Sequence, residues 1–145
     1  MPARPDLAAM IAPLGRALMA AERPILESHG LTMWAYAVLL GLEESPVRTQ
    51  SALAQTIGAD KTRIIPTLDD LQERGLITRT PDPADRRARL LSLTPAGREL
   101  RDRAQAAIQR REDELLSILS PDLRRDFVRA LQQLSAHDGS QDPKP

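Results

Sequence analysis

The chain has 145 residues, and its 20 basic and 20 acidic side chains give a formal net charge of zero. It contains no cysteine, which excludes disulfides, thiolate metal sites, cysteine nucleophiles and thiol-based redox sensing. Only 2% of its residues are aromatic, so the core must be built mainly from leucine, isoleucine and alanine, which favours helices.

Catalysis and membrane insertion find little support in the sequence. With only His29 and His137 available, we expect no metal site and no cofactor. The chain lacks a Ser/His/Asp set, a phosphate loop and metal-ligand spacing, so we expect that it is not an enzyme. The apolar stretch from Leu7 to Leu14 is closed by Arg16, which fits neither a secretion signal nor a membrane span. We therefore expect a cytoplasmic protein without a membrane partner.

Two helices are predicted at the start of the chain. Apolar residues recur at helical steps over residues 6–28, namely at Leu7, Ile11, Leu14, Leu18 and Ile25. Pro24 lies inside this stretch and is expected to bend the helix. Gly30 breaks the pattern, and Thr32 is a suitable N-cap for a second helix that runs to residue 42.

Two shorter helices are expected next. The first covers residues 49–57 and ends at Gly58, and the second covers residues 61–74, with Asp60 as its cap and Gly75 after its end. The apolar stripe of the second consists of Ile64, Leu68 and Leu71. Such a pair is a helix-turn-helix pattern, although the same pattern also occurs in ordinary core packing.

The period changes after residue 75. Leu76–Thr80 and Arg89–Leu93 are short runs typical of strands, and the turn-forming cluster Pro81–Asp85 separates them. This predicts a hairpin, whose tip carries Arg86 and Arg87. A helix followed by such a basic hairpin can reach two neighbouring DNA grooves, which favours a winged helix-turn-helix.

Two further helices complete a fold that is mainly α with a small β-hairpin wing. Thr94–Pro95 and Ser120–Pro121 are each a cap followed by a first-turn proline. We expect an N-terminal helix in residues 1–30, a winged helix-turn-helix in 31–94, two helices in 95–136, and a disordered tail in 137–145.

The helices at both chain ends carry apolar stripes that one small domain cannot easily bury. The two ends can form a helical dimerisation region between two copies of the chain, or they can cover one another within one copy. The residues concerned are Leu7, Ile11, Leu14, Leu123, Phe127 and Leu131.

The stretch Asp82–Arg87 followed by Leu90–Gly97 resembles the wing signature of the MarR (multiple antibiotic resistance regulator) family of transcriptional regulators. Leu71 and residues 73–77 also match the family's usual exit from the recognition helix. The order of the predicted elements matches the family over residues 6–136. The specific motif is confined to residues 71–97.

The resemblance implies a homodimer in which the first and the last two helices pair between subunits and each winged lobe reads half of a palindromic operator. It also implies that Arg87 enters the minor groove and that Asp85 orients it by an ion pair. A guanidinium is planar and weakly hydrated, so it suits the negative potential of a narrow A·T-rich minor groove. The alternative is a solvated surface hairpin. The family's thiol-based peroxide-sensing branch is excluded, because the chain has no cysteine.

Other DNA contacts are expected from the fourth helix and the wing. Thr62 and Arg63 are predicted to read bases, whereas Lys61 at the helix start is better placed for phosphate. The remaining members of the predicted DNA-binding set are Pro66, Thr67, Arg86 and Arg89. Pro66 is expected about a turn and a half into the helix, where it removes a backbone hydrogen bond and bends the axis. It can also contact a thymine methyl group, or simply be tolerated because the helix is short.

Members of this family often release DNA when a small aromatic or anionic molecule binds between the dimer helices and the DNA-binding lobe. By resemblance, Arg16, His29, Trp34 and Tyr36 would line that cleft. Trp34 and Tyr36 can stack on a phenolic ring. In the simpler interpretation, which we favour, Trp34 is a core anchor, Tyr36 is half-exposed and His29 is satisfied within its loop.

The sequence therefore predicts a DNA-binding transcriptional regulator, and more narrowly a repressor. The alternative is a winged-helix module that binds protein rather than DNA, since one fold can serve several functions. Thr62, Arg63 and the wing arginines argue against that alternative.

Overall fold

A computed structural model describes residues 2–42 and 47–137. The chain divides into two compact units, Met1–Ile108 and Gln109–Pro145, which we describe in turn. Within the described ranges no helix is both long and apolar enough to cross a membrane. In the same ranges, no group of three or more His, Cys, Asp or Glu residues is arranged to hold a metal ion.

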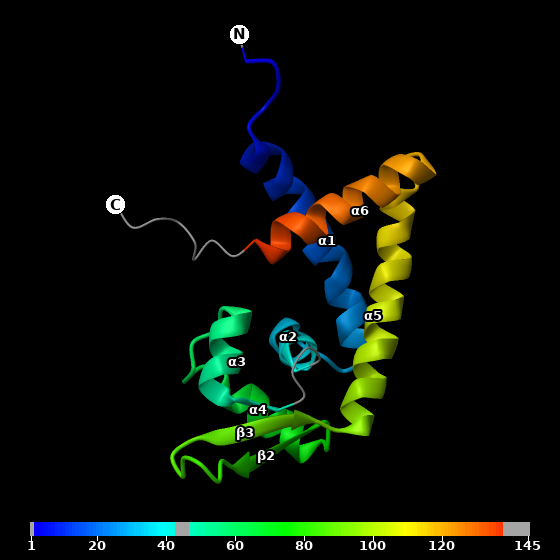
Figure 1. The fold of residues 1–145 in the computed structure, drawn as a ribbon. Coiled ribbons are helices and arrows are strands. Elements are labelled where there is room, and N and C mark those ends of the chain that lie inside the picture. The colour runs from blue at the N-terminus through cyan, green and yellow to red at the C-terminus, as the bar shows by residue number, and fades with distance from the viewer. Residues whose placement is uncertain (1, 43–46, 138–145) are drawn as a thin grey trace, which may run out of the picture. The chain divides into compact units, whose positions relative to one another are not determined.

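The first two helices are α1 (Leu7–Ser28) and α2 (Met33–Gly41) (Figure 1). Gly30 has a left-handed φ of 70°, and the N–H of Leu31 bonds to the carbonyl oxygen of Leu26 at 2.9 Å, so α1 ends in a Schellman turn. The hydroxyl oxygen of Thr32 accepts a hydrogen bond from the N–H of Ala35 at 3.1 Å and caps α2. The predicted break at Gly30 and the predicted cap are both confirmed.

A short strand that the sequence did not predict precedes the third helix. This strand, β1 (Val47–Thr49), leads into α3 (Gln50–Ile57), and the Thr49 hydroxyl caps α3 by accepting from the N–H of Ala52. The strand pairs antiparallel with β3 (Arg89–Leu93), which also pairs with β2 (Ile77–Pro81). The sheet therefore has three strands in the order β1-β3-β2, and the predicted hairpin forms two of them.

The fourth helix, α4 (Ile65–Glu73), begins four residues later than predicted. Pro66 is its second residue, so the prediction that Pro66 lies inside the helix and bends it is wrong. In the first turn of a helix the N–H groups have no intrahelical partner, and a proline there costs no hydrogen bond. At the other end, Gly75 has a φ of 73° and the N–H of Leu76 bonds to the carbonyl oxygen of Leu71 at 2.9 Å, as expected.

The wing is attached to α4 and to the fifth helix, α5 (Pro95–Leu116), through Thr94. The Thr94 hydroxyl accepts from the N–H of Gly97 at 3.0 Å, which caps α5 as predicted, and donates to the carbonyl oxygen of Gly75 at 2.7 Å. The N–H of Thr94 bonds to the carbonyl oxygen of Leu76 at 3.1 Å. The ends of α4 and β3 and the start of α5 are thus fixed to one another.

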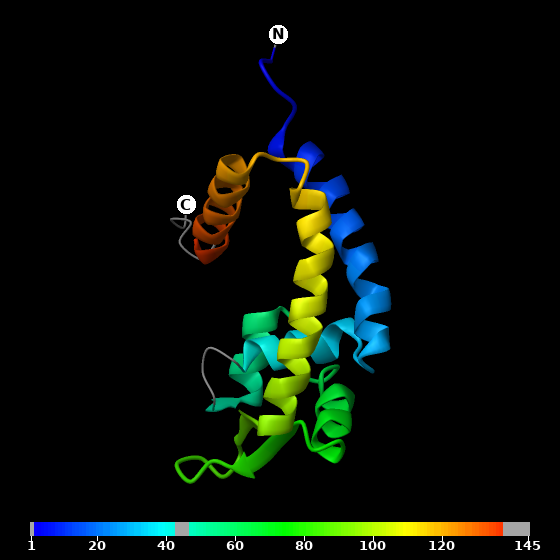
Figure 2. The same ribbon diagram turned by 90° about the vertical axis from the view of Figure 1, so that its right-hand side faces the viewer.

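The core of the first unit lies between α2, α3, α4 and the sheet. Its fully buried side chains come from every one of these elements and from the end of α1; they are Leu26, Val38, Leu39, Leu42, Leu53, Leu68, Leu71, Ile77 and Leu91. Figure 2 shows the β2–β3 hairpin projecting beyond the helices of this unit, with the connecting loop at its free end. The mainly helical fold with a small wing is as predicted.

The second unit contains the end of α5 and the last helix, α6 (Pro121–Ala136). The Ser120 hydroxyl caps α6 by accepting from the N–H of Leu123, as predicted. Arg124 donates from Nε to the carbonyl oxygen of Leu116 at 3.1 Å and from Nη2 to that of Leu119 at 3.3 Å, which caps the end of α5. The tail predicted in residues 137–145 lies, apart from His137, outside the described residues.

Candidate nucleic-acid interface

Lys61, Thr62 and Arg63 lie in a capped turn before α4 rather than on the helix itself. Asp60 closes the turn, because its Oδ1 accepts from the N–H of Thr62 at 2.8 Å and its carbonyl oxygen accepts from the N–H of Ile64 at 3.1 Å. Ile64 is buried, whereas the three polar side chains are exposed. The three side chains are therefore accessible, as DNA contacts require, although they lie on a turn and not on the predicted helix.

The two other predicted contact residues in this region differ in exposure. Pro66 is exposed at the start of α4, and Thr67 is partly buried. The turn before α4 and the first turn of the helix thus form one small exposed surface, with the polar side chains of Lys61, Thr62 and Arg63 and the apolar ring of Pro66.

The loop at the tip of the wing, residues 82–88, is closed by its own hydrogen bonds. The N–H of Asp82 bonds to the carbonyl oxygen of Ala88 at 3.0 Å, and Asp82 Oδ1 accepts from the N–H of Ala84 at 2.9 Å. Arg86 and Arg87 are exposed on this loop, as is Arg89 on β3. Three arginine side chains therefore stand on the projecting end of the hairpin.

Asp85 holds the backbone of Arg87 rather than its guanidinium. Its Oδ1 accepts a hydrogen bond from the N–H of Arg87 at 3.0 Å, a contact typical of Asx turns. Among the described residues the ion pairs do not include one between these two side chains, so the mechanism predicted for Asp85 needs correction. Asp85 shapes the loop from which Arg87 projects, and it leaves the guanidinium to the solvent.

Arg79 links the wing to α4 and was missed by the sequence analysis. It donates from Nε to Gln72 Oε1 at 2.6 Å and from Nη2 to Asp69 Oδ1, so its fork spans two residues on one face of α4. A hollow of about 330 Å³ next to it is lined by Gln50, Gln72, Arg79 and Arg89. The pairing of the two wing strands could have indicated Arg79, because it places this residue opposite the buried Leu91. Paired residues point to the same face of a sheet, so Arg79 points toward the helices and not toward the solvent.

The four residues predicted to line a ligand cleft do not form one pocket in the first unit. Arg16 and His29 are separated by 13 positions along α1, which corresponds to about 20 Å at 1.5 Å per residue. Trp34 and Tyr36 are two positions apart, so they point to nearly opposite sides of α2. Tyr36 is buried and Trp34 is 50% exposed, which is the reverse of the favoured interpretation.

His29 is satisfied locally, as the simpler interpretation expected. Its Nδ1 lies 2.8 Å from the carbonyl oxygen of Ile25, so Nδ1 carries the proton and donates it to that oxygen. Ser28 Oγ lies 3.2 Å from the same nitrogen. His29 thus closes the last turn of α1.

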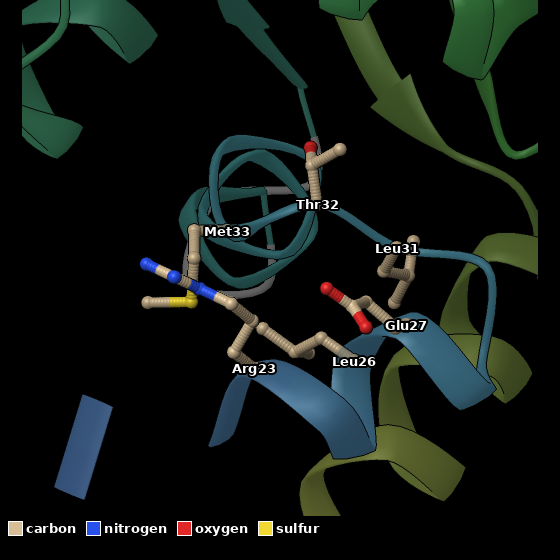
Figure 3. Close-up of a pocket in the computed structure, with 6 residues that line it drawn as sticks. All are labelled: Arg23, Leu26, Glu27, Leu31, Thr32 and Met33. Carbon is tan, nitrogen blue, oxygen red and sulfur yellow. The ribbon is translucent and has the colours of Figure 1, made fainter. Parts of the chain in front are cut away.

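A pocket of about 180 Å³ does occur at the junction of α1 and α2. Figure 3 shows Arg23, Leu26 and Glu27 rising from α1 toward the start of α2. The remaining lining residues are Leu31, Thr32 and Met33. The pocket combines an apolar floor with one guanidinium and one carboxylate, which suits a small molecule with one ring and one polar end.

The apolar residues predicted for dimerisation are poorly covered within one chain. On α1, Leu7 and Ile11 are 57% and 56% exposed, and Leu14 is partly buried. On α6, Leu123 and Leu131 are exposed and Phe127 is partly buried, and this helix has no buried residue. Each of these two helices therefore carries an apolar face that its own unit leaves largely uncovered.

One carboxyl group in the second unit is electrostatically perturbed. Burial raises the pKa of Glu112 on α5 above its ordinary value, and the negative charge of Asp113 raises it further. Glu112 is only partly buried, so solvent moderates the effect.

Comparisons with known proteins agree on one family. The family model described as the MarR family matches residues 29–88, which cover α2, the helix-turn-helix, β2 and the whole wing loop. A protein of Thauera aromatica, assigned as a transcriptional regulatory protein for the hcr operon, is 32% identical over 116 residues. That alignment covers 80% of this chain and 70% of the relative.

Two solved structures of the transcriptional repressor CouR are similar over nearly the whole chain. CouR bound to a 23-mer DNA duplex is 30% identical, with a TM-score of 0.76 and coverage of 90% of this chain and 92% of that one. CouR from Rhodococcus jostii RHA1 bound to p-coumaroyl-CoA is also 30% identical, with a TM-score of 0.73 and coverage of 92% and 94%. The wing motif, the helix-turn-helix and these relatives lead to one conclusion: the chain belongs to the MarR family of DNA-binding transcriptional regulators.

Proposed function

We propose that this protein is a repressor, not an enzyme, that acts in the cytoplasm and binds a palindromic operator as a homodimer. The observation that carries the proposal is the pairing of two exposed cationic surfaces, the Lys61–Arg63 turn before α4 and the arginine-bearing loop of the wing. They lie on separate projections of one lobe, as contacts to a major groove and to an adjacent minor groove require. The DNA-bound repressor CouR supports the same assignment.

The two surfaces have different roles in this proposal. Thr62 and Arg63 read base edges, and Lys61 contacts phosphate. Arg87 enters the minor groove, while Arg86 and Arg89 add attraction to the phosphate backbone. Asp85 contributes by shaping the loop through the N–H of Arg87.

The dimer follows from the open apolar faces of the end helices. Residues 1–30 and 95–136 form the dimerisation region, and residues 31–94 form the DNA-binding lobe. A second copy of the chain would cover Leu7 and Ile11 on α1 and Leu123 and Leu131 on α6, all of which are largely exposed in one copy. Burial of apolar surface contributes about 25 cal/mol per Å² before entropic costs, so burying these leucine and isoleucine side chains would favour dimerisation.

Arg87 and Arg63 provide the test of DNA binding. Replacing Arg87 by Ala should weaken binding to many sequences and lower the slope of log affinity against log salt by roughly one unit per half-site, because a groove cation is lost. Replacing Arg63 by Ala should cost about 1–3 kcal/mol on the preferred palindrome and less on poor sequences. Half-site centres should lie about 10 base pairs apart.

The assay is a titration of each variant over a salt series, on a palindrome selected from random DNA and on scrambled DNA. Arg98→Ala is the matched control, because Arg98 is an exposed arginine of the same unit that lies on α5, away from both surfaces. Unchanged affinity and slope for Arg87→Ala would mean that the wing does not touch DNA. The fold is not at issue, because all three side chains are exposed.

We further propose that a small aromatic or anionic effector releases the DNA, and that it binds in the pocket between α1 and α2. Arg23 supplies the cation for an anionic group, and Leu26, Leu31 and Met33 supply apolar contacts for a ring. Glu27 lines the same pocket, where its carboxylate would accept a hydrogen bond from a hydroxyl group of the ligand and would repel an anionic group placed next to it. The structure of CouR bound to p-coumaroyl-CoA supports a ligand with an aromatic acyl group as the class of effector. A volume of about 180 Å³ accommodates a single ring rather than a whole coenzyme.

Trp34 offers a direct readout for this part of the proposal. It is the only tryptophan of the chain and follows the pocket residue Met33. Titration with p-coumarate should change its fluorescence and lower the affinity for the operator, and Arg23→Gln should weaken both effects. If the Arg23→Gln variant responds as the wild type does, the pocket is not the effector site.

A further inference from the structure

Arg74, the C-cap residue of α4, reaches back to the turn between α1 and α2. Its Nη1 donates a hydrogen bond to the main-chain carbonyl oxygen of Gly30 at 2.9 Å, although the two residues are 44 positions apart. The same nitrogen lies 3.5 Å from Asp70 Oδ2, one turn earlier in α4. The guanidinium therefore has one partner on the recognition helix and another outside it.

The Gly30 end of this contact is held firmly by the surrounding backbone. Gly30 lies in the Schellman turn that ends α1, and the residues on its two sides that close the turn, Leu26 and Leu31, are both buried. A Cβ atom built on Gly30 would lie 3.2 Å from Arg74 Nη2, so the guanidinium packs directly against the turn. The carbonyl oxygen that receives the hydrogen bond is exposed, but the turn that carries it is anchored in the core by Leu26 and Leu31.

At its other end, the contact holds the C-terminal end of the short helix α4. The helix α4 has nine residues, which corresponds to a length of about 13 Å. Arg74 lies at its C-terminal end, and the Lys61–Arg63 turn precedes its N-terminal end. Because so short a helix moves as a rigid rod, a fixed C-terminal end limits the directions in which the Lys61–Arg63 turn can point.

We infer that Arg74 is a positioning residue, which holds α4 at a fixed angle to the α1–α2 turn and thereby sets the half-site spacing that the dimer prefers. The inference rests on the proposed function, because α1 is one of the helices that pair between copies in that proposal. A dimer discriminates between spacings only if each recognition helix is held firmly relative to the dimer helices. Loss of the Arg74 contact should therefore loosen the spacing preference more than it weakens the reading of a half-site.

The test compares operators that differ only in spacing. Wild type, Arg74→Met, Arg74→Lys and Asp70→Asn are titrated on the selected palindrome, on palindromes with one base pair more or less between the half-sites, and on a single half-site. Wild type should lose about tenfold or more in affinity when the spacing changes, which is the scale of one mismatched position. For Arg74→Met this loss should fall to about threefold, while half-site affinity and salt slope stay at wild-type values.

The two other variants separate the Gly30 contact from its neighbours. Arg74→Lys keeps a cation that can reach the Gly30 carbonyl oxygen, so it should restore part of the spacing preference. Asp70→Asn removes the partner within α4 and keeps the Gly30 contact, so it should behave as wild type. Thermal melting of all four proteins checks that they are equally folded.

Three results would overturn the inference. These are a full wild-type spacing preference in Arg74→Met, an equal loosening in Asp70→Asn, and a lower salt slope in Arg74→Met, which would make Arg74 a phosphate contact. A wild-type protein that binds no palindrome at any spacing would overturn the proposed function as well, and this failure is recognised without any variant.

Discussion

Gly97 is the position where the smallest substitution should have the largest effect on stability. It lies in the first turn of α5, and a Cβ atom built there would be 2.0 Å from the carbonyl oxygen of Leu76 and 2.9 Å from Leu93 Cδ1. Atoms of folded proteins do not approach so closely, and the contact with Leu76 is with backbone, which a side-chain rotation cannot relieve. The start of α5 must therefore move away from Leu76 by about 1 Å or more before Gly97→Ala fits.

The magnitude follows from opposing terms. Overpacking typically costs about 1–3 kcal/mol. The displacement also strains the hydrogen bond from the N–H of Thr94 to the carbonyl oxygen of Leu76, worth about 1 kcal/mol. The better helix propensity of alanine returns at most about 1 kcal/mol. We expect a net loss of about 1–4 kcal/mol, which lowers Tm by roughly 3–15 °C in a chain of this size.

The assay is thermal unfolding followed by far-UV circular dichroism at two protein concentrations, because dimerisation makes Tm depend on concentration. Gly15→Ala is the matched control, since Gly15 also lies in a helix and its added Cβ meets no atom within 4 Å apart from its chain neighbours and the backbone of its own helix. That control should gain about 0.5–1 kcal/mol from propensity alone. A Gly97→Ala protein that melts at or above the wild-type temperature would show that the close approach to Leu76 does not exist in solution.

Three further outcomes are expected. Leu131→Glu places a charge on the open apolar face of α6 and should halve the mass measured by light scattering, with loss of operator binding, because a leucine buried in an interface contributes about 2–5 kcal/mol. Gln133→Glu is the control, because Gln133 is exposed and lies two positions from Leu131, on the opposite side of α6. An unchanged mass for Leu131→Glu would remove α6 from the interface. Since the pKa of Glu112 is raised in the fold, the folded protein favours the protonated carboxyl group. The stability that the protonated group provides is lost as the pH rises through the raised pKa and the carboxylate forms. Glu112→Gln should therefore leave Tm nearly unchanged at a pH below the ordinary glutamate pKa of about 4.3 and raise it at pH 7, and an equal effect at both pH values would contradict this reasoning. Pro66→Ala restores an N–H that can bond to the carbonyl oxygen of Thr62, so α4 can extend back through residues 62–64. The free energy of unfolding should fall by about 0.4–1 kcal/mol, and selection from random DNA should give a changed base preference. An unchanged preference would mean that Thr62 and Arg63 keep their placement.

Most element ends were predictable because they depend on a few neighbouring residues. Thr32, Thr94 and Ser120 each cap a helix with their own hydroxyl, and Gly30 and Gly75 take the left-handed conformation that ends one. The start of α4 was not predictable from the apolar stripe alone. In the turn at residues 61–64, buried and exposed side chains occur at the same positions as they would in a helix. Only Pro66, which lacks an N–H, distinguishes the turn from a helix in the sequence.

The strand β1 escaped prediction for a different reason. Three residues are too few for an alternating pattern, and Val47–Thr49 is extended because β3 offers it a free edge. Pairing of this kind depends on a segment some forty positions away in the chain, and local sequence carries no trace of it. The same explanation applies to the Arg74–Gly30 contact, which joins two residues that are distant in sequence.

The candidate site was predictable where it depends on exposed residues of a motif and not where it depends on packing. The wing arginines and the Lys61–Arg63 turn are exposed as expected. The ligand cleft stays a prediction, and helix geometry already separates two of its four residues. Side chains two positions apart are about 200° apart around a helix, so Trp34 and Tyr36 could not face one ring together.

The hydrogen bonds inside the wing loop affect the thermodynamics of any partner that the loop meets. The carboxylates of Asp82 and Asp85 bind backbone N–H groups of residues 84 and 87, so the loop loses its conformational entropy when the chain folds. Association then has only the arginine side chains left to order. Insertion of this loop into a groove would therefore be a rigid-body association. Its heat-capacity change would depend on the contact surface alone and would lack the large negative value that accompanies folding upon binding.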